Sequence, residues 1–217
     1  MKKKTILNSA TKQKLLSNNK SIKFDWKSDP DKGIIIRNQK LGVSLNYYAV
    51  FDENNNFNYD TFGIEERDGN CVAVVLNQNN EICLLKEHRF MPDKYFLSCP
   101  RGFSDFQDEK RLDTALREVR QEVGEFEIIE TIDLGNLYQN TTFFLKPVGV
   151  MLVKVKINKQ IEINKHQKSE DIEGVTFYKL GTVKKMITDG KIECLITLGA
   201  LSKYFCYIEN QRKKIRE

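Results

Sequence analysis

Short apolar runs separated by polar turns fill the chain between Ile34 and Arg89. The clearest example is CVAVVLNQNNEICLLKE, at 71–87, in which two apolar segments flank a polar four-residue turn. Runs of this length, rich in β-branched residues, are typical of strands joined as hairpins. The other runs are GIIIRNQ, GVSLNYYAVF and DTFGIEE, and clusters of Asn, Asp and Gly separate them. This part of the chain therefore predicts a series of antiparallel strands.

The apolar spacing changes after Pro100, in DEKRLDTALREVRQEVGE at 108–125. Apolar residues here recur at intervals of three and four, at Leu112, Ala115, Leu116, Val119 and Val123. That spacing predicts one apolar face of an amphipathic helix. Asp108 and Asp113 lie near its start, where the helix dipole favours anions, and Gly124 is suited to end it.

Strand-like runs return after this helix, in EIIETIDLGNLY, PVGVMLVKVKI and VTFYKL. The pattern ends in a helix from about Thr182 to Ile208, with a polar break at TDGK. This order of elements indicates an α+β fold and not a repeated β–α–β unit. We expect a polar basic arm at 1–20, an N-terminal strand extension at 21–66 and a main domain at 67–217.

Composition and charge exclude several classes of protein. The chain has 217 residues, 40% of them hydrophobic, which is enough for a packed core. Much of its charge of +5 lies at the two ends, which we interpret as solvated first and as a nucleic-acid surface only second. No apolar run approaches the roughly 18 residues of a membrane span. The basic start is not followed by the apolar segment of a secretory signal.

The five cysteines form no CxxC pair, and most of them lie inside apolar runs. We expect buried thiols in a reducing, cytoplasmic compartment. A catalytic cysteine is the alternative, but neither His88 nor His166 stands in a nucleophile–base pattern. The histidines also lack the ligand spacing of a metal site.

Two glutamates of the predicted helix, Glu118 and Glu122, are four residues apart and lie one turn apart on one face. They flank the apolar stripe, and Gln121 extends this polar flank. Like charges at this spacing repel each other, whereas a hard divalent cation such as Mg²⁺ prefers oxygen ligands of this kind. From the helix alone, an ordinary surface helix with paired charges is an equal alternative.

The surrounding sequence favours the metal site. Glu109, seven further residues and then REVRQEVG at 117–124 resemble the signature of the Nudix hydrolases. CPRGF resembles the loop that opens this signature, with Gly102 as its glycine. The hairpin at 71–90 and the stretch SEDIEGVTFYKLGTVKKMITDGKI resemble the ADP-ribose pyrophosphatase-like branch of the family.

This resemblance implies a Nudix-type α/β/α sandwich with a mixed sheet. The strands before residue 67 resemble the antiparallel N-terminal extension through which this branch often dimerises, so we expect a homodimer. The resemblance also implies that Glu109 and Arg117 brace the loop against the helix, and that Gly102 and Gly124 are structural.

Three positions depart from the family signature. Six residues separate Gly102 from Glu109, one more than usual, yet the spacing from Glu109 to Arg117 is correct and favours Glu109 over Asp108 as the bracing acid. Glu125 stands where an apolar residue is usual. Gln121 replaces the first glutamate of a Glu-Glu pair, which keeps a carbonyl ligand but removes one negative charge.

The activity implied is hydrolysis of the pyrophosphate in a nucleoside diphosphate linked to another moiety, of the ADP-ribose or nucleotide-sugar class. The implied cofactor is Mg²⁺ or Mn²⁺, held by Glu118, Glu122 and Gln121 with the backbone near Gly102. A second function stays open because of Gln121, namely a degenerate Nudix domain that binds or senses a nucleotide without cleaving it.

Other residues have a functional and a structural interpretation. Glu170 or Asp171 in the late loop would accept the proton of the attacking water, or would belong to a solvated turn. Arg89 and Arg101 would contact phosphate or sugar, or pair with surface acids. Three aromatic residues would stack a nucleobase or pack in the core, and these are Tyr47, Tyr138 and Phe144. LYQNTTFFLKP at 137–147 lacks the early proline of many ADP-ribose pyrophosphatases, which favours a different leaving group.

Overall fold

A computed structural model of the chain describes residues 17, 26–29, 34–39, 41–51, 53, 57–106, 109–158, 167–168 and 170–214. The predicted basic arm at 1–20 lies outside these residues except for Ser17. His166 and Asp108, the alternative bracing acid, lie outside them as well. Between Trp26 and Lys214, the described elements follow the predicted order of strands, helix, strands and helix.

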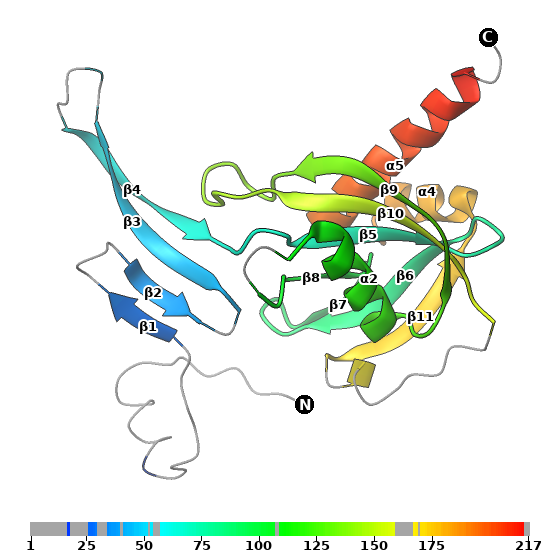
Figure 1. Cartoon of the computed structure of the whole chain (residues 1–217), viewed down its shortest axis with the longest axis horizontal. Helices are drawn as coiled ribbons and strands as arrows, with labels where there is room; N and C mark the ends of the chain where they lie inside the picture. Colours follow the sequence, from blue (N-terminus) through cyan, green and yellow to red (C-terminus); the bar gives the residue numbers. More distant parts are fainter. Residues whose placement is uncertain are drawn as a thin grey trace.

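The N-terminal extension forms an antiparallel sheet whose four strands follow chain order. They are β1 (Trp26–Asp29), β2 (Ile34–Asn38), β3 (Val43–Phe51) and β4 (Phe57–Glu65). The apolar runs predict β2, β3 and β4, whereas β1 has the sequence WKSD and too few apolar residues to be recognised. The extension lies to one side of the main sheet (Figure 1). Backbone hydrogen bonds of Ile64 with Phe143 (2.6 Å) and Leu145 (3.0 Å) join the two parts.

The main sheet is mixed, with the order β11-β6-β5-β10-β9. Its strands are β5 (Cys71–Leu76), β6 (Ile82–Arg89), β9 (Glu127–Leu137), β10 (Val148–Lys156) and β11 (Ile172–Tyr178). β5 and β10 are parallel, whereas β10 and β9, β11 and β6, and β5 and β6 are antiparallel. Two short strands complete the sheet: β7 (Lys94–Ser98) pairs with β6, and β8 (Arg101–Gly102) pairs with β5.

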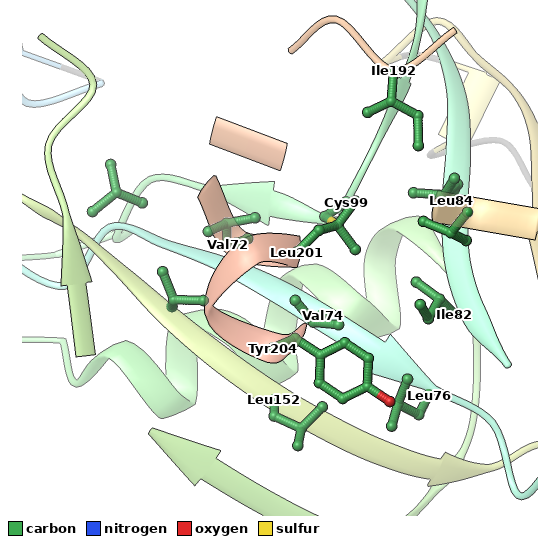
Figure 2. Close-up of a cluster of buried hydrophobic side chains, with 14 residues drawn as sticks. Val72, Val74, Leu76, Ile82, Leu84, Cys99, Leu152, Ile192, Leu201 and Tyr204 are labelled. Atoms are coloured by element: carbon green, nitrogen blue, oxygen red, sulfur yellow. The ribbon is translucent and has the colours of Figure 1, made fainter. Parts of the chain in front are cut away.

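Helices cover both faces of this sheet, namely α2 (Arg111–Glu122) on one face and α4 (Leu180–Thr188) and α5 (Leu195–Lys214) on the other. Successive side chains of a strand point to opposite faces, so β5 contributes to two separate cores. One core joins Val72, Val74 and Leu76 to Val183 of α4 and to Leu201 and Tyr204 of α5 (Figure 2). The other joins Cys71, Ala73 and Val75 to Ala115, Val119 and Val123 of the α2 region. The predicted α+β sandwich with a mixed sheet is therefore confirmed.

The last helix is interrupted where the sequence predicts a polar break: α4 ends at Thr188, the first residue of TDGK, and α5 begins at Leu195. The expectation of buried cysteines is correct for Cys71, Cys83 and Cys99 but wrong for Cys206, which is exposed on α5; Cys194 is half-buried. None of the described helices is both long and apolar enough to span a membrane.

Candidate active site

Helix α2 presents two carboxylates at the edge of its buried face. Ala115 and Val119 are fully buried against the sheet, and burying an apolar side chain of valine size contributes about 1.5–3 kcal/mol. Glu118 and Glu122 flank this apolar stripe and are 7% and 3% exposed, respectively. Gly124, with a φ of +120°, follows the helix and donates its backbone N–H to Val119 at 3.2 Å. Only glycine adopts such a φ without strain, so Gly124 is suited to end the helix.

The loop that follows β8 lies directly against these carboxylates. β8 pairs with β5, so that Gly102 is opposite Cys71. The backbone N–H of Arg101 donates to Oε2 of Glu122 at 3.0 Å. A Cβ atom at Gly102 would overlap the Glu118 carboxyl group. Gly102 therefore permits a close approach of the loop to α2.

Arg117 connects the loop and the helix. It donates to both Glu109 oxygens (3.3 and 3.4 Å), to the Phe103 carbonyl oxygen (2.7 Å) and to Oε1 of Glu118 (2.6 Å). Burial alone would raise the pKa of Glu109, but the hydrogen bonds from Arg117 and from the Asp105 backbone lower it overall. Glu109 thus forms a charged pair with Arg117, which also contacts the loop at Phe103 and the helix at Glu118; this pair is called the brace below.

A cleft of about 600 Å³ opens beside this brace. Many of the residues that border it have a role predicted from the sequence: Arg89, Arg101, Gly102, Arg117, Glu118, Gln121, Glu122 and Glu170. Other bordering residues come from the N-terminal part and from the strand ends, among them Leu41, Glu66, Asn70 and Gln139. The cleft therefore joins the acidic edge of α2 to arginines of β6 and β8.

The two glutamates of α2 are electrostatically perturbed. Burial raises the pKa of Glu118 to about 7, although its pairing with Arg117 opposes this shift. The pKa of Glu122 is raised well above its usual range, first by burial and then by the charges of Glu118 and Glu87. Gln121 accepts a hydrogen bond from Nη1 of Arg117 at 3.3 Å, so its amide oxygen lies beside the same guanidinium group as Glu118.

A family model of the NUDIX domain matches residues 67–196, which is more than half of the chain. The protein belongs to the Nudix family. A solved structure of an ADP compounds hydrolase is similar to this chain: the two are 13% identical, the match covers 78% of this chain and 88% of that chain, and the TM-score is 0.60. At this identity the similarity shows that the fold is shared. No curated protein sequence matches the chain.

Glu170 and Asp171, the two candidate general bases on the late acidic loop of this Nudix domain, differ in whether they border the cleft. Glu170 borders the cleft, whereas Asp171 does not belong to the described residues that line it. Asp171 has a φ of +61°, and its carbonyl oxygen accepts the backbone N–H of His88 at 3.0 Å. Gln167, which is 1% exposed, donates from Nε2 to the carbonyl oxygen of Glu122 at 2.7 Å and so fastens this loop to the end of the Nudix helix.

Sequence analysis missed two buried acids near the cleft, Glu66 and Glu87. Glu66 borders the cleft and accepts a hydrogen bond from Asn70 at 3.2 Å, and burial raises its pKa. Glu87 is 2% exposed and lies beside Arg89 and Arg101. The two-residue period of β6 is a signal for Glu87, because it places Glu87 on the same face as Cys83 and Leu85, which α2 covers.

A separate groove of about 750 Å³ lies between β4 and the loop at 138–145. Its lining includes two of the predicted aromatic residues, Tyr138 and Phe144, together with Tyr48 and the stacked rings of Phe62 and Phe143, whose centroids are 5.1 Å apart. The side chain of Tyr47 lies outside the described part of the structure. The protein therefore has an aromatic groove between its N-terminal extension and its Nudix domain, in addition to the polar cleft.

Proposed function

We propose that this Nudix protein is a Mg²⁺- or Mn²⁺-dependent pyrophosphohydrolase. Its substrate would be a nucleoside diphosphate linked to another moiety, of the ADP-ribose or nucleotide-sugar class. The observation that carries the proposal is that buried Glu118 and Glu122 border the same cleft as Arg89 and Arg101. Carboxylates suit a divalent cation and guanidinium groups suit phosphate oxygens, so one cleft contains both kinds of group that a metal-bound diphosphate requires.

The residues present fit a divalent cation. Among the described residues, no Lys or Arg forms an ion pair with Glu122, and a buried carboxylate without a positive partner is costly. The described side chains of His, Cys, Asp and Glu include no group of three or more that is gathered as a metal site. The two carboxylates of Glu118 and Glu122 nevertheless suit Mg²⁺, because this ion commonly takes one or two carboxylates and completes its shell with water and substrate phosphates.

Each residue has a definite part in the proposed reaction. A bound metal would neutralise phosphate oxygens and lower the pKa of water. Glu118 and Glu122 would hold it, and both are kept in place, Glu118 by Arg117 at 2.6 Å and Glu122 by the Arg101 backbone at 3.0 Å. Glu170 borders the cleft, so we propose Glu170, in preference to Asp171, as the acceptor of the water proton.

The aromatic groove supports a substrate of the nucleotide type. Gln139 borders the polar cleft, and Tyr138, its neighbour in the chain, borders the groove, so one short segment contributes to both. Aromatic side chains bind nucleobases by stacking on their faces. The nucleobase would therefore lie in this groove while the diphosphate occupies the cleft.

A substrate panel tests the proposal. The purified protein is incubated with ADP-ribose, several nucleoside diphosphate sugars and dinucleotides, and the products are separated by chromatography. We expect cleavage of at least one compound into nucleoside monophosphate and the phosphorylated second moiety, in Mg²⁺ or Mn²⁺ and not in EDTA. Cleavage that is unchanged in EDTA would contradict the metal assignment.

The alternative function, nucleotide binding without hydrolysis, is favoured by one observation, the contact of Gln121 with Arg117 where a carboxylate would add metal affinity. The same panel separates the two functions when it is repeated with Gln121→Glu. Binding without products in the natural chain, together with turnover in Gln121→Glu, would identify a domain that senses a nucleotide. Turnover by the natural chain would exclude that alternative.

We also propose that the protein is a homodimer and acts in the cytoplasm. The N-terminal sheet supports the first proposal because it carries a large apolar side chain, Ile36, that is 37% exposed. Light scattering at micromolar concentration should give twice the mass of 25.3 kDa for one chain. A mass equal to that of a single chain would contradict the dimer. The cytoplasmic location stays a prediction.

A further inference from the structure

Glu87 is a buried carboxylate that the proposed reaction does not use. It lies on β6, and its side chain is only 3% exposed. A charge at such a position is costly unless it is paired and hydrogen-bonded. The surroundings of Glu87 therefore indicate which interaction compensates for its burial.

Two arginines of the cleft flank this carboxylate. Oε2 of Glu87 is 2.5 Å from Nη2 of Arg89, and Oε1 is 3.8 Å from Nη2 of Arg101. The Arg101 guanidinium also donates from Nη1 to Sγ of Cys194 at 3.3 Å. Arg89 and Arg101 both border the cleft, whereas Glu87 lies behind them and is absent from the described lining.

The hydrogen bonding of this cluster is incomplete. Among the described residues, Oε1 of Glu87 and Nε of Arg89 are buried without a hydrogen-bond partner. Unsatisfied buried polar groups are rare in folded proteins, and a functional role or a bound water or ion is among their explanations. The Nε–H group of Arg89 is a donor of the kind that makes bidentate contacts with oxyanions. Within the part of the chain that the structure describes, Nε–H of Arg89 is therefore a donor without a partner in a residue that borders the cleft, whereas Oε1 of Glu87 needs a donor and not an anion.

The charges of the cluster favour the same interpretation. Two guanidinium groups beside one cleft repel each other, and the carboxylate between them offsets that repulsion. Glu87 thereby allows both arginines to lie at the cleft before any anion is bound. A site arranged in advance binds more tightly because its side chains lose less freedom on binding.

We propose that Glu87 is a positioning residue that holds Arg89 and Arg101 as a clamp for the diphosphate group of the ligand. The proposal rests on the proposed function for the identity of the ligand as a diphosphate. It assigns to β6 and β8 an anion subsite that is distinct from the carboxylates of α2.

The variant Glu87→Gln distinguishes positioning from simple electrostatics because the two predict opposite signs. Glutamine removes a negative charge near the bound anion, so electrostatics alone predicts tighter binding. Loss of positioning predicts weaker binding, because Arg89 is no longer held in its fork geometry. The direction of the change in affinity therefore decides between the two.

The experiment is isothermal titration of ADP and, separately, inorganic pyrophosphate into the full chain in EDTA, which isolates the arginines from any metal. The variants are Glu87→Gln, Arg89→Gln and the double variant. The matched control is Glu173→Gln, which removes a half-exposed carboxylate that pairs with Lys86 on β6.

We expect about tenfold weaker binding of each anion by each single variant, which corresponds to the loss of one well-oriented charged contact. The double variant should lose less affinity than the sum of the two single losses, because part of the effect of Glu87 passes through Arg89. Glu173→Gln should bind like the natural chain.

Circular dichroism checks that each variant is folded. If Glu87→Gln does not fold, Arg89→Lys tests the same contact from its more exposed partner and should also bind about tenfold more weakly. Unchanged or tighter binding by Glu87→Gln, additive losses in the double variant, or no binding of either anion by the natural chain would each overturn the proposal. If the natural chain cleaves a compound of the panel but Glu87→Gln binds the anions as the natural chain does, this inference alone is overturned. Anion binding that depends on Glu87, without turnover, would instead overturn the proposed hydrolysis.

Discussion

Glu122→Gln is expected to lower metal-dependent turnover by about 10³-fold, since metal ions supply several kcal/mol of charge stabilisation in such reactions. The substitution keeps the shape of the side chain and can retain the contact with the Arg101 backbone, but it removes the negative charge that holds the cation. Turnover is measured with the best compound of the panel at saturating Mg²⁺. Glu125→Gln is the matched control, because Glu125 is exposed just beyond the same helix and does not border the cleft.

The same variant is expected to be more stable than the natural protein when no metal is present. The folded pKa of Glu122 is raised, so the folded protein binds more protons than the unfolded chain and loses stability as pH rises above the unfolded value of 4.5. At pH 8, the substitution with glutamine removes this loss of folding stability. We expect the melting temperature in EDTA to rise by about 2–4 °C, which corresponds to about 1 kcal/mol for a protein of this size. Full turnover by Glu122→Gln, or a lower melting temperature in EDTA, would contradict these roles.

Gly102→Ala is expected to reduce turnover by about 10²-fold, because a displacement of about 1 Å in a catalytic group can have an effect of this size. The added Cβ would overlap the carboxyl group of Glu118. Arg117 holds that carboxyl at 2.6 Å, so Glu118 would have to leave its position beside Glu122. Steady-state kinetics with the best substrate of the panel measures the effect.

Gly181→Ala is the control for this prediction. Gly181 lies in α4, where a Cβ would meet no atom within 4 Å, and turnover should stay unchanged. Turnover by Gly102→Ala within about twofold of the natural protein would show that Glu118 tolerates displacement, and would argue against its role as a ligand of the metal.

The parts of the fold that the sequence predicts are those with a local periodic signal. The spacing of Val119 and Val123 defines α2 without any knowledge of its partners. β8 gives no such signal, because its two residues are a strand only through pairing with β5. The break between α4 and α5 could be predicted from TDGK, since its glycine adopts a φ of +70°.

The candidate site divides in the same way. The residues on α2 and its loop share one local signature, so Glu109, Arg117, Glu118 and Glu122 could be predicted together. Glu66 could not, because its burial depends on elements far away in sequence, whereas the two-residue period of β6 is a signal for Glu87. The difference between Glu170 and Asp171 also required the structure, since only Glu170 is among the described residues that border the cleft. Proximity in sequence therefore did not reveal which acid borders the cleft.

The cleft extends beyond the segment that defines the family. Leu41 and Glu66 border it, yet both precede residue 67, where the family match begins. The loop at 138–145, which the extension holds through Ile64, contributes Gln139 to the same cleft. Under the proposed function, the metal ligands would lie inside the segment that defines the family, and part of the wall that contacts the substrate would lie before it. Relatives that keep the Nudix helix but exchange the residues before it would inherit the chemistry together with a new choice of substrate.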